Sequence, residues 1–127
     1  MAVVDDEKDI VLLFRDALSQ IDSCTVFGFT DPQAALEHFI TNQQFYYLIL
    51  TDFRMPTLTG IQLIMKMNEI KPSIRAILVS AFEVRDEENF QQCMKKNIIN
   101  SFLQKPVALS DLIEEVKNQI GQTNKEA

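Results

Sequence analysis

Polar side chains capable of catalysis or ligand binding follow the short apolar segments of this chain. They are Asp5, Asp6, Asp52, Ser80 and Lys105. Carboxylates can ligate a hard cation or act as nucleophiles, a hydroxyl can donate a hydrogen bond to an anion, and an ammonium can neutralise one. Any one of them alone is more often a turn or helix-capping residue. Their joint placement after successive runs is harder to explain by packing, so we interpret them as one site.

The runs belong to a repeating pattern that predicts the elements positioning these side chains. Short apolar runs alternate with segments whose apolar residues recur at helical spacing. The expected strands are 2–4, 24–29, 46–51, 75–80 and 99–103, and the expected helices are 10–21, 32–40, 61–70, 86–97 and 111–120. Five such units imply an α/β fold: a doubly wound parallel sheet with helices on both faces. The carboxyl ends of its strands form the active edge.

The length of 127 residues suits a single domain. We expect the domain to cover residues 1–120, followed by a polar C-terminal tail, 121–127, that frays. Asp31 followed by Pro32 predicts one helix start, and Ser110 is expected to cap the final helix.

The composition excludes several classes of function. A formal net charge of −6 argues against direct nucleic-acid binding, which needs clustered Lys and Arg. The sequence contains neither a membrane-spanning apolar run nor a signal peptide, so a cytoplasmic protein is expected. Cys24 and Cys93 are far apart and are expected to be reduced, packed thiols, and His38 is expected to have a surface or packing role.

Four motifs resemble those of response-regulator receiver domains. They are Val3-Val4-Asp5-Asp6-Glu7, Asp52-Phe53-Arg54-Met55-Pro56 followed by Gly60, Ser80-Ala81, and Phe102-Leu103-Gln104-Lys105-Pro106. Each motif alone is weak, but the ordered set spans essentially the whole chain. The resemblance implies the flavodoxin-like (βα)5 receiver fold with strand order 2-1-3-4-5, in which the first and third strands are neighbours.

That strand order would bring Asp5, Asp6 and Asp52 into one pocket, where their carboxylates repel each other. A hard divalent cation relieves such repulsion, and Mg²⁺ prefers oxygen ligands. By resemblance, Asp52 is the phosphoacceptor. Asp6 and Asp52 then bind Mg²⁺ directly, together with the backbone carbonyl of Arg54, and Asp5 acts through metal-bound water.

The resemblance assigns further roles. Lys105 holds the phosphoryl group, and the Lys105-Pro106 bond is expected to be cis. Ser80 is the switch hydroxyl, and Phe102 is the switch aromatic in place of the Tyr often found there. Residues expected to act structurally are Pro56, Gly60, Ala81 and Pro106.

The resemblance also implies a signalling domain rather than an enzyme in the ordinary sense, belonging to a two-component system or phosphorelay. Its expected partners are a histidine kinase or histidine phosphotransfer protein, which donates the phosphoryl group. A downstream protein or output domain would bind the face made by the last two helices and the fifth strand. No interaction with a membrane is expected.

Three other classes were compared with this interpretation. A flavodoxin-like cofactor binder needs a Gly-, Ser- or Thr-rich loop after the first strand, but this chain has Asp5-Asp6-Glu7 there. A haloacid-dehalogenase-type phosphatase needs an Asp where Arg54 stands. A phosphorylation-independent pseudo-receiver is the main alternative, although it typically lacks one of the key residues and none is missing here. The chain departs from the receiver pattern at Ile98-Ile99, where a small Gly-Ala step is common.

Overall fold

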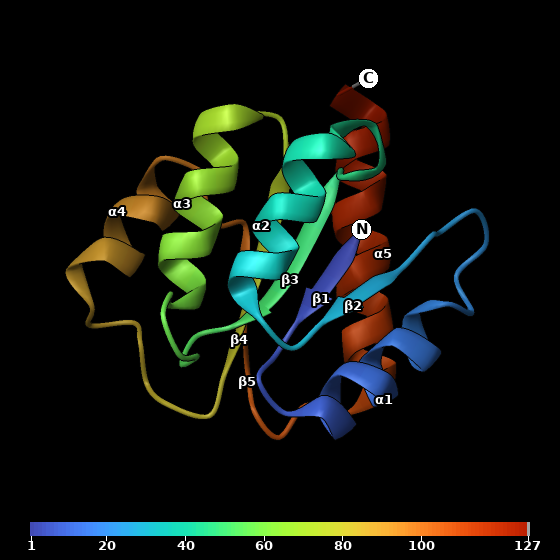
Figure 1. Cartoon of the computed structure of the whole chain (residues 1–127), viewed down its shortest axis with the longest axis horizontal. Helices are drawn as coiled ribbons and strands as arrows, with labels where there is room; N and C mark the ends of the chain where they lie inside the picture. Colours follow the sequence, from blue (N-terminus) through green and yellow to red (C-terminus); the bar gives the residue numbers. More distant parts are fainter. Residues whose placement is uncertain (127) are drawn as a thin grey trace.

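The computed structural model describes the backbone of residues 1–126 and the side chains of residues 1–121. One five-stranded parallel sheet has the order β2-β1-β3-β4-β5, which confirms the predicted fold (Figure 1). The strands are β1 (Ala2–Val4), β2 (Phe27–Phe29), β3 (Leu48–Asp52), β4 (Arg75–Ser80) and β5 (Ser101–Gln104). The helices are α1 (Lys8–Leu18), α2 (Pro32–Thr41), α3 (Gly60–Ile70), α4 (Glu88–Lys95) and α5 (Leu109–Glu126), with a short 3-10 helix η1 (Gln43–Phe45).

Helices cover both faces of the sheet, as Figure 1 shows. Helices α2, α3 and α4 pack on one face, and α1 and α5 pack on the other. The alternation of side chains along β3 feeds both cores: Ile49 joins the first, and Leu48 and Leu50 join the second. The central strands are therefore apolar on both sides, as expected for a covered parallel sheet.

The edge strand β2 is shorter than predicted. The sequence indicated a strand over residues 24–29, but only Phe27–Phe29 pair with a neighbour. The reason is that β1, its partner in the sheet, has three residues, so Ala2 pairs with Phe27 and Val4 with Phe29. The length of a strand thus depends on its partner as well as on its own residues.

The start and the length of the last helix also differ from the prediction. Ser110 lies inside the first turn of α5 rather than capping it, because the N–H of Leu112 already donates to the carbonyl of Ala108. The helix continues to Glu126, into the stretch expected to form a frayed tail. Ala127 lies outside the described residues. Helix α4 is shorter than predicted and covers Glu88–Lys95.

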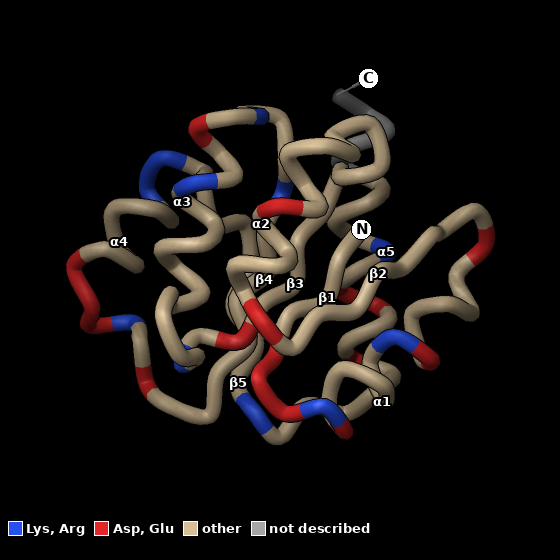
Figure 2. Tube along the Cα trace, viewed as in Figure 1, with Lys and Arg blue, Asp and Glu red and all other residues tan. Residues whose placement is uncertain are grey.

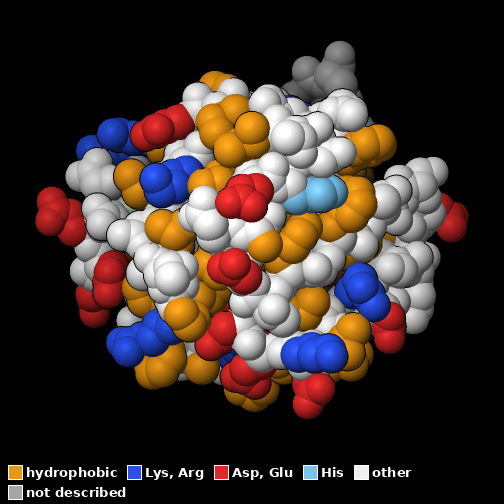
Figure 3. Space-filling view, in the orientation of Figure 1, with side chains coloured by type: hydrophobic (Ala, Val, Ile, Leu, Met, Phe, Trp, Pro, Cys, Tyr) orange, Lys and Arg blue, Asp and Glu red, His pale blue; other side chains and the backbone are white. Residues whose placement is uncertain are grey.

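Helix α2 begins as the sequence predicts, with the Asp31 side chain accepting a hydrogen bond from the N–H of Gln33. Its His38 packs against aromatic rings, and Nδ1 lies 2.7 Å from the hydroxyl of buried Tyr46. Figure 3 shows this side chain in pale blue among hydrophobic neighbours, in agreement with the expected packing role. No helix within residues 1–126 combines the length and the apolar composition that a membrane crossing requires.

Candidate functional site

The first two site residues follow β1. Val4 pairs with Thr51 of β3, so the next residues along the two strands, Asp5 and Asp52, are neighbours at the carboxyl edge of the sheet. The Asp5 side chain is 3% exposed, and its Oδ1 accepts a hydrogen bond of 2.9 Å from the N–H of Glu7. Asp6 is exposed beside it. The short loop after β1 therefore holds one buried and one accessible carboxylate.

Asp52 is the last residue of β3, and its side chain is 12% exposed. The chain turns back over it at Gly60, where α3 begins. A Cβ atom at Gly60 would clash with the carbonyl oxygen of Asp52, and it would lie 2.9 Å from the Leu78 side chain. Only a glycine lets the helix start this close to the strand end, which gives Gly60 a physical role at the site.

Lys105 reaches the same pocket from the loop that follows β5. Its Nζ donates to Asp5 Oδ2 at 2.7 Å and lies 3.5 Å from Asp52 Oδ1. The backbone N–H of Lys105 donates to the carbonyl of Ser80 at 2.8 Å, which fixes the start of this loop against β4. The Lys105-Pro106 peptide bond is cis, as expected from the sequence.

The three acids form a group whose ligand atoms all lie within 4.8 Å of one another, contributed by Asp5, Asp6 and Asp52. Burial, and then the nearby charge of Asp5, raise the pKa of Asp52 to about 6, although Lys105 opposes the shift. Burial works to lower the pKa of Lys105, but the hydrogen bond and charge of Asp5 outweigh it and hold this pKa above its ordinary value. Figure 2 shows the acidic segments gathered at this end of β1 and β3.

This donor set fits a hard divalent cation. The pocket offers carboxylate oxygens from the loop after β1 and from the end of β3, and such oxygens are the ligands Mg²⁺ prefers. Burial and then the charge of Asp5 raise the pKa of Asp52 despite Lys105, and a cation would favour the charged form of this carboxylate. Asp5 already has both oxygens engaged, by Glu7 and Lys105, so Asp6 and Asp52 have the freer carboxylates.

Ser80 and Phe102 lie on neighbouring strands. Ser80 is fully buried at the end of β4, and its Oγ accepts a hydrogen bond of 3.0 Å from the N–H of Phe82. Phe102 on β5 is half-buried, and its ring meets the ring of Phe90 from α4 edge-on, with centroids 5.6 Å apart. The structure thus joins the end of β4 to the loop that follows it, and β5 to α4.

Sequence reasoning missed one contact at the site. The guanidinium carbon of Arg54 lies 4.1 Å from the centroid of the Phe82 ring, which is 49% exposed. This cation–π pair joins the β3–α3 loop to the β4–α4 loop, the two loops that follow Asp52 and Ser80. An exposed aromatic two residues after Ser80 is a signal in the sequence that could have pointed to it.

The remaining predicted structural residues lie in the loops around the pocket. Pro56 is exposed in the β3–α3 loop, one residue before Thr57, which has a φ of 73°. Ala81 and Pro106 line an apolar groove beside Lys105 together with α1. All the predicted site residues therefore gather at the carboxyl edge, except Phe102, which lies along β5.

Comparison with known proteins agrees with this geometry. The response regulator receiver domain family matches residues 1–117, so the chain belongs to this family of two-component signalling domains. No curated protein matches the chain at a significant level.

Solved structures of similar fold include a CheY-like response regulator receiver domain protein from Methanospirillum hungatei JF-1. It is 25% identical, with a TM-score of 0.85 over 99% of this chain and 96% of that chain. A receiver domain from Clostridium thermocellum is 26% identical, with a TM-score of 0.87 over 99% and 97%. The response regulator domain of Thermotoga maritima CheB is 25% identical, with a TM-score of 0.73 over 96% and 92%.

Proposed function

We propose that Asp52 accepts a phosphoryl group from a histidine kinase or histidine phosphotransfer protein in a Mg²⁺-dependent reaction. One observation carries the proposal: the Asp52 carboxylate lies at the end of a central strand, between an acid pair and the Nζ of Lys105, 3.5 Å away. Membership of the receiver family supports it. The arrangement supplies an oxygen nucleophile, an amine for the incoming anion and ligands for a cation.

The cation would be held by Asp6, Asp52 and the backbone carbonyl of Arg54, with Asp5 contributing through water. Bound there, Mg²⁺ supplies positive charge that offsets the charge on the phosphoryl oxygens. The engagement of both Asp5 oxygens by Glu7 and Lys105 supports the indirect role of Asp5.

In the transfer, an Oδ of Asp52 forms the new bond to phosphorus as the bond from phosphorus to the donor histidine nitrogen breaks. The electron pair of that bond returns to the imidazole ring, which leaves neutral after taking up or retaining one proton. Lys105 neutralises the phosphoryl oxygens from the opposite side, and its raised pKa keeps it protonated at neutral pH.

An apolar groove beside the pocket supports docking of such a donor. It is lined by Ile10, Leu13, Phe14, Ala81, Lys105, Pro106, Val107 and Glu7. Leu13 is 47% exposed, so burying it would favour binding of a partner that brings its histidine to Asp52.

The output would follow from Ser80 and Phe102. The Ser80 Oγ accepts a bond from Phe82, so its own hydrogen is available to donate to a phosphoryl oxygen. Movement of Ser80 would change the space beside β4, and Phe102 would turn to follow it. Because Phe102 contacts Phe90 of α4, this turn would alter the face formed by α4, β5 and α5, where a downstream protein or output domain binds.

Mass spectrometry after incubation with Mg²⁺ and acetyl phosphate tests the acceptor. We expect an alkali-labile phosphoryl group on the wild type and its loss in Asp52→Asn. Asp9→Asn, which removes an exposed acid from α1, is the matched control and should be labelled normally. Undiminished labelling of Asp52→Asn would contradict the assignment, and a wild type that is never labelled would favour a pseudo-receiver that binds partners without phosphorylation.

A further inference from the structure

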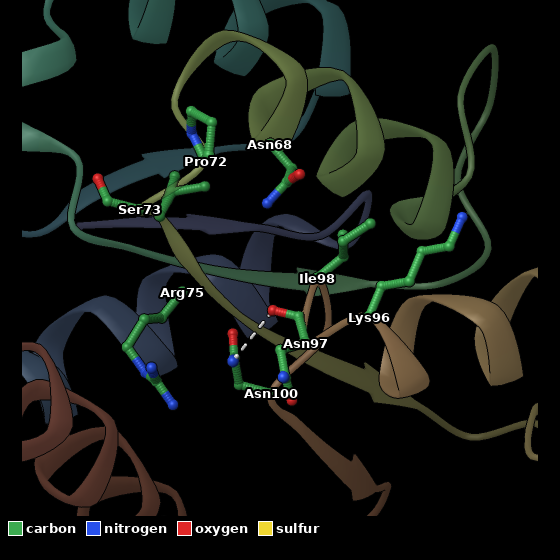
Figure 4. A pocket seen from close by; sticks show the side chains of 9 residues that line it. Asn68, Pro72, Ser73, Arg75, Lys96, Asn97, Ile98 and Asn100 are labelled. Atoms are coloured by element: carbon green, nitrogen blue, oxygen red, sulfur yellow. Dashed lines mark hydrogen bonds between the residues drawn. The ribbon is translucent and has the colours of Figure 1, made fainter.

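Buried polar side chains are few in this chain. Within residues 1–121 they belong to Asp5, Thr51, Ser80 and Gln119. The first and third are part of the candidate site. Gln119 accepts a hydrogen bond of 2.8 Å from Nε of Arg75 at the amino end of the sheet, where Figure 4 shows the Arg75 side chain extending toward α5. Thr51, the residue before Asp52, takes no part in the proposed transfer, so its buried hydroxyl calls for another explanation.

Thr51 is 1% exposed and has apolar neighbours in the sheet. It pairs with Val4 of β1 and Leu78 of β4, and both belong to the core on the face covered by α2, α3 and α4. Ile49 belongs to the same core, and side chains two residues apart on a strand share a face, so the Thr51 side chain also faces these helices. A valine would fill this space without a polar atom, whereas a buried hydroxyl costs free energy unless it is hydrogen-bonded.

The hydroxyl of Thr51 contacts the chain on both sides of Arg54. Its Oγ1 donates to the carbonyl of Asp52 at 3.0 Å and lies 3.9 Å from Sδ of Met55. A hydroxyl has one hydrogen, and a thioether sulfur is a weak acceptor, so the bond to the carbonyl is the stronger of the two. Together, the two contacts hold the start of the β3–α3 loop against the core.

Further bonds fix the chain between Asp52 and Arg54. The N–H of Phe53 donates to the carbonyl of Val79 at 3.2 Å, and the carbonyl of Phe53 accepts from the N–H of Gly60 at 2.7 Å. The peptide group between residues 52 and 53 is therefore fixed at its oxygen by Thr51 and at its nitrogen by β4. The carbonyl of Arg54 follows one residue later, so its position depends on the direction in which the chain leaves this fixed point.

We propose that Thr51 is a positioning residue for the cation site. Its hydroxyl sets the course of the chain from Asp52 to Met55 and so places the backbone carbonyl of Arg54 relative to the Asp52 carboxylate. The inference rests on the proposed function, in which this carbonyl and this carboxylate both bind Mg²⁺. Because Mg²⁺ demands near-octahedral geometry at about 2.0–2.1 Å, a small displacement of one ligand weakens binding. Groups that orient metal ligands typically contribute about 10–100-fold to metal affinity.

Two substitutions separate the hydroxyl of Thr51 from its shape. Thr51→Val removes the hydroxyl and keeps the branched side chain, and it should bind Mg²⁺ roughly tenfold more weakly than the wild type. Thr51→Ser keeps the hydroxyl and should restore the affinity. Stability in urea should follow the opposite order, with Thr51→Ser less stable than Thr51→Val, because deleting a buried methyl group leaves a cavity. Thr41→Val removes an exposed hydroxyl that bonds within α2, and this matched control should bind like the wild type.

Amide-resolved NMR titration with Mg²⁺ alone, without a phosphodonor, measures these affinities. The amide nitrogen of Met55 is covalently bonded to the carbonyl carbon of Arg54, so its chemical shift reports ligation of that carbonyl. At saturating Mg²⁺, the shift of this nitrogen should be large in the wild type and in Thr51→Ser, and smaller in Thr51→Val. A residue that only stabilised the fold would not change this signal.

Equal Mg²⁺ affinities and equal Met55 shifts in the wild type and Thr51→Val would overturn the inference and leave the proposed function intact. Equally weak binding by Thr51→Val and Thr51→Ser would also overturn it, because packing rather than the hydroxyl would then be the cause. A wild type without saturable shifts at Asp6 and Asp52 would contradict the proposed metal site itself, and the inference with it.

Discussion

At the carboxyl end of the sheet, burial and then the charge of Asp5 raise the pKa of Asp52 to about 6, and Lys105 offsets only part of this shift. At the amino end, the polar groups complete one another: the side chain and backbone of Asn100 bond to both backbone groups of Ala76. The carboxyl end therefore holds charges that the chain compensates only in part, whereas Asn100 and Ala76 at the amino end satisfy each other.

The difference shows that polar residues at the two ends of one sheet serve different purposes. A bonded polar group at the amino end stabilises the fold, so removing it can only cost free energy. A buried, crowded carboxylate at the carboxyl end destabilises the fold in the absence of a cation, so removing it can stabilise the protein. The sign of the change in stability therefore distinguishes removal of the Asp52 carboxylate from removal of the Asn100 amide.

Lys105→Met is expected to change the free energy of unfolding most. This change leaves Asp5, 3% exposed, and Asp52 without their cation, and an unpaired buried charge costs several kcal/mol. Because the lysine side chain is 16% exposed, water limits the loss, and we expect a free energy of unfolding lower by about 3 kcal/mol. Urea unfolding without divalent ions measures it. The double variant Lys105→Met/Asp52→Asn should recover part of the loss, and no recovery would contradict carboxylate repulsion as the cause.

At the amino end, Asn100→Ala should lower the free energy of unfolding by about 2 kcal/mol, because the N–H of buried Ala76 loses its acceptor. Asn100→Asp keeps an oxygen at the same place and should be less destabilising. Urea unfolding with and without Mg²⁺ should give the same difference in both conditions. A destabilisation that Mg²⁺ reverses would mean that the two ends are coupled.

In contrast, Asp52→Asn is expected to raise the free energy of unfolding. Because the folded-state pKa of Asp52 is raised from 3.8 to about 6, its contribution to stability is fully present below pH 3.8 and is lost as the pH rises through 6. Without divalent ions, the variant should be more stable than the wild type by about 1–2 kcal/mol at pH 7, and this advantage should vanish near pH 3.8.

Mg²⁺ sharpens this prediction. A ligand at about 100 times its dissociation constant adds about 2.7 kcal/mol if it binds only the folded state. Thermal melting should therefore rise with millimolar Mg²⁺ in the wild type, and rise less in Asp52→Asn and Asp6→Asn. Asp9→Asn, outside the acidic group, is the control. An equal rise in all four proteins would place the cation elsewhere.

The sequence predicted the carboxyl end better than the amino end, for a physical reason. Positions at strand ends follow from the alternation of elements, and the strand order implied by the receiver resemblance brings Asp5, Asp52, Ser80 and Lys105 together. Strand β4 has the predicted bounds, Arg75–Ser80, because apolar residues and turn signals mark both of its limits. At the amino end, the bonds between Asn100 and Ala76 join the loop after α4 to β4, and no periodicity encodes this approach.

The contact between Arg54 and Phe82 also joins two loops, so the sequence pattern did not predict it. Its loss is expected to change the free energy of unfolding least. An exposed cation–π pair contributes about 0.5–1 kcal/mol, so Arg54→Ala should lower the free energy of unfolding by less than about 1 kcal/mol. The pair joins the loops that follow Asp52 and Ser80, and its loss should loosen both loops and admit water. If Asp52 is phosphorylated as proposed, the phosphoryl half-life should shorten severalfold, as measured by loss of label after removal of the donor.

Phe82→Leu is the matched variant, because it keeps an apolar side chain but removes the ring face that the guanidinium contacts. Similar half-lives in Arg54→Ala and Phe82→Leu, both shorter than in the wild type, would establish the pair as the cause. An unchanged half-life in Phe82→Leu would mean that Arg54 acts through its charge, without the ring.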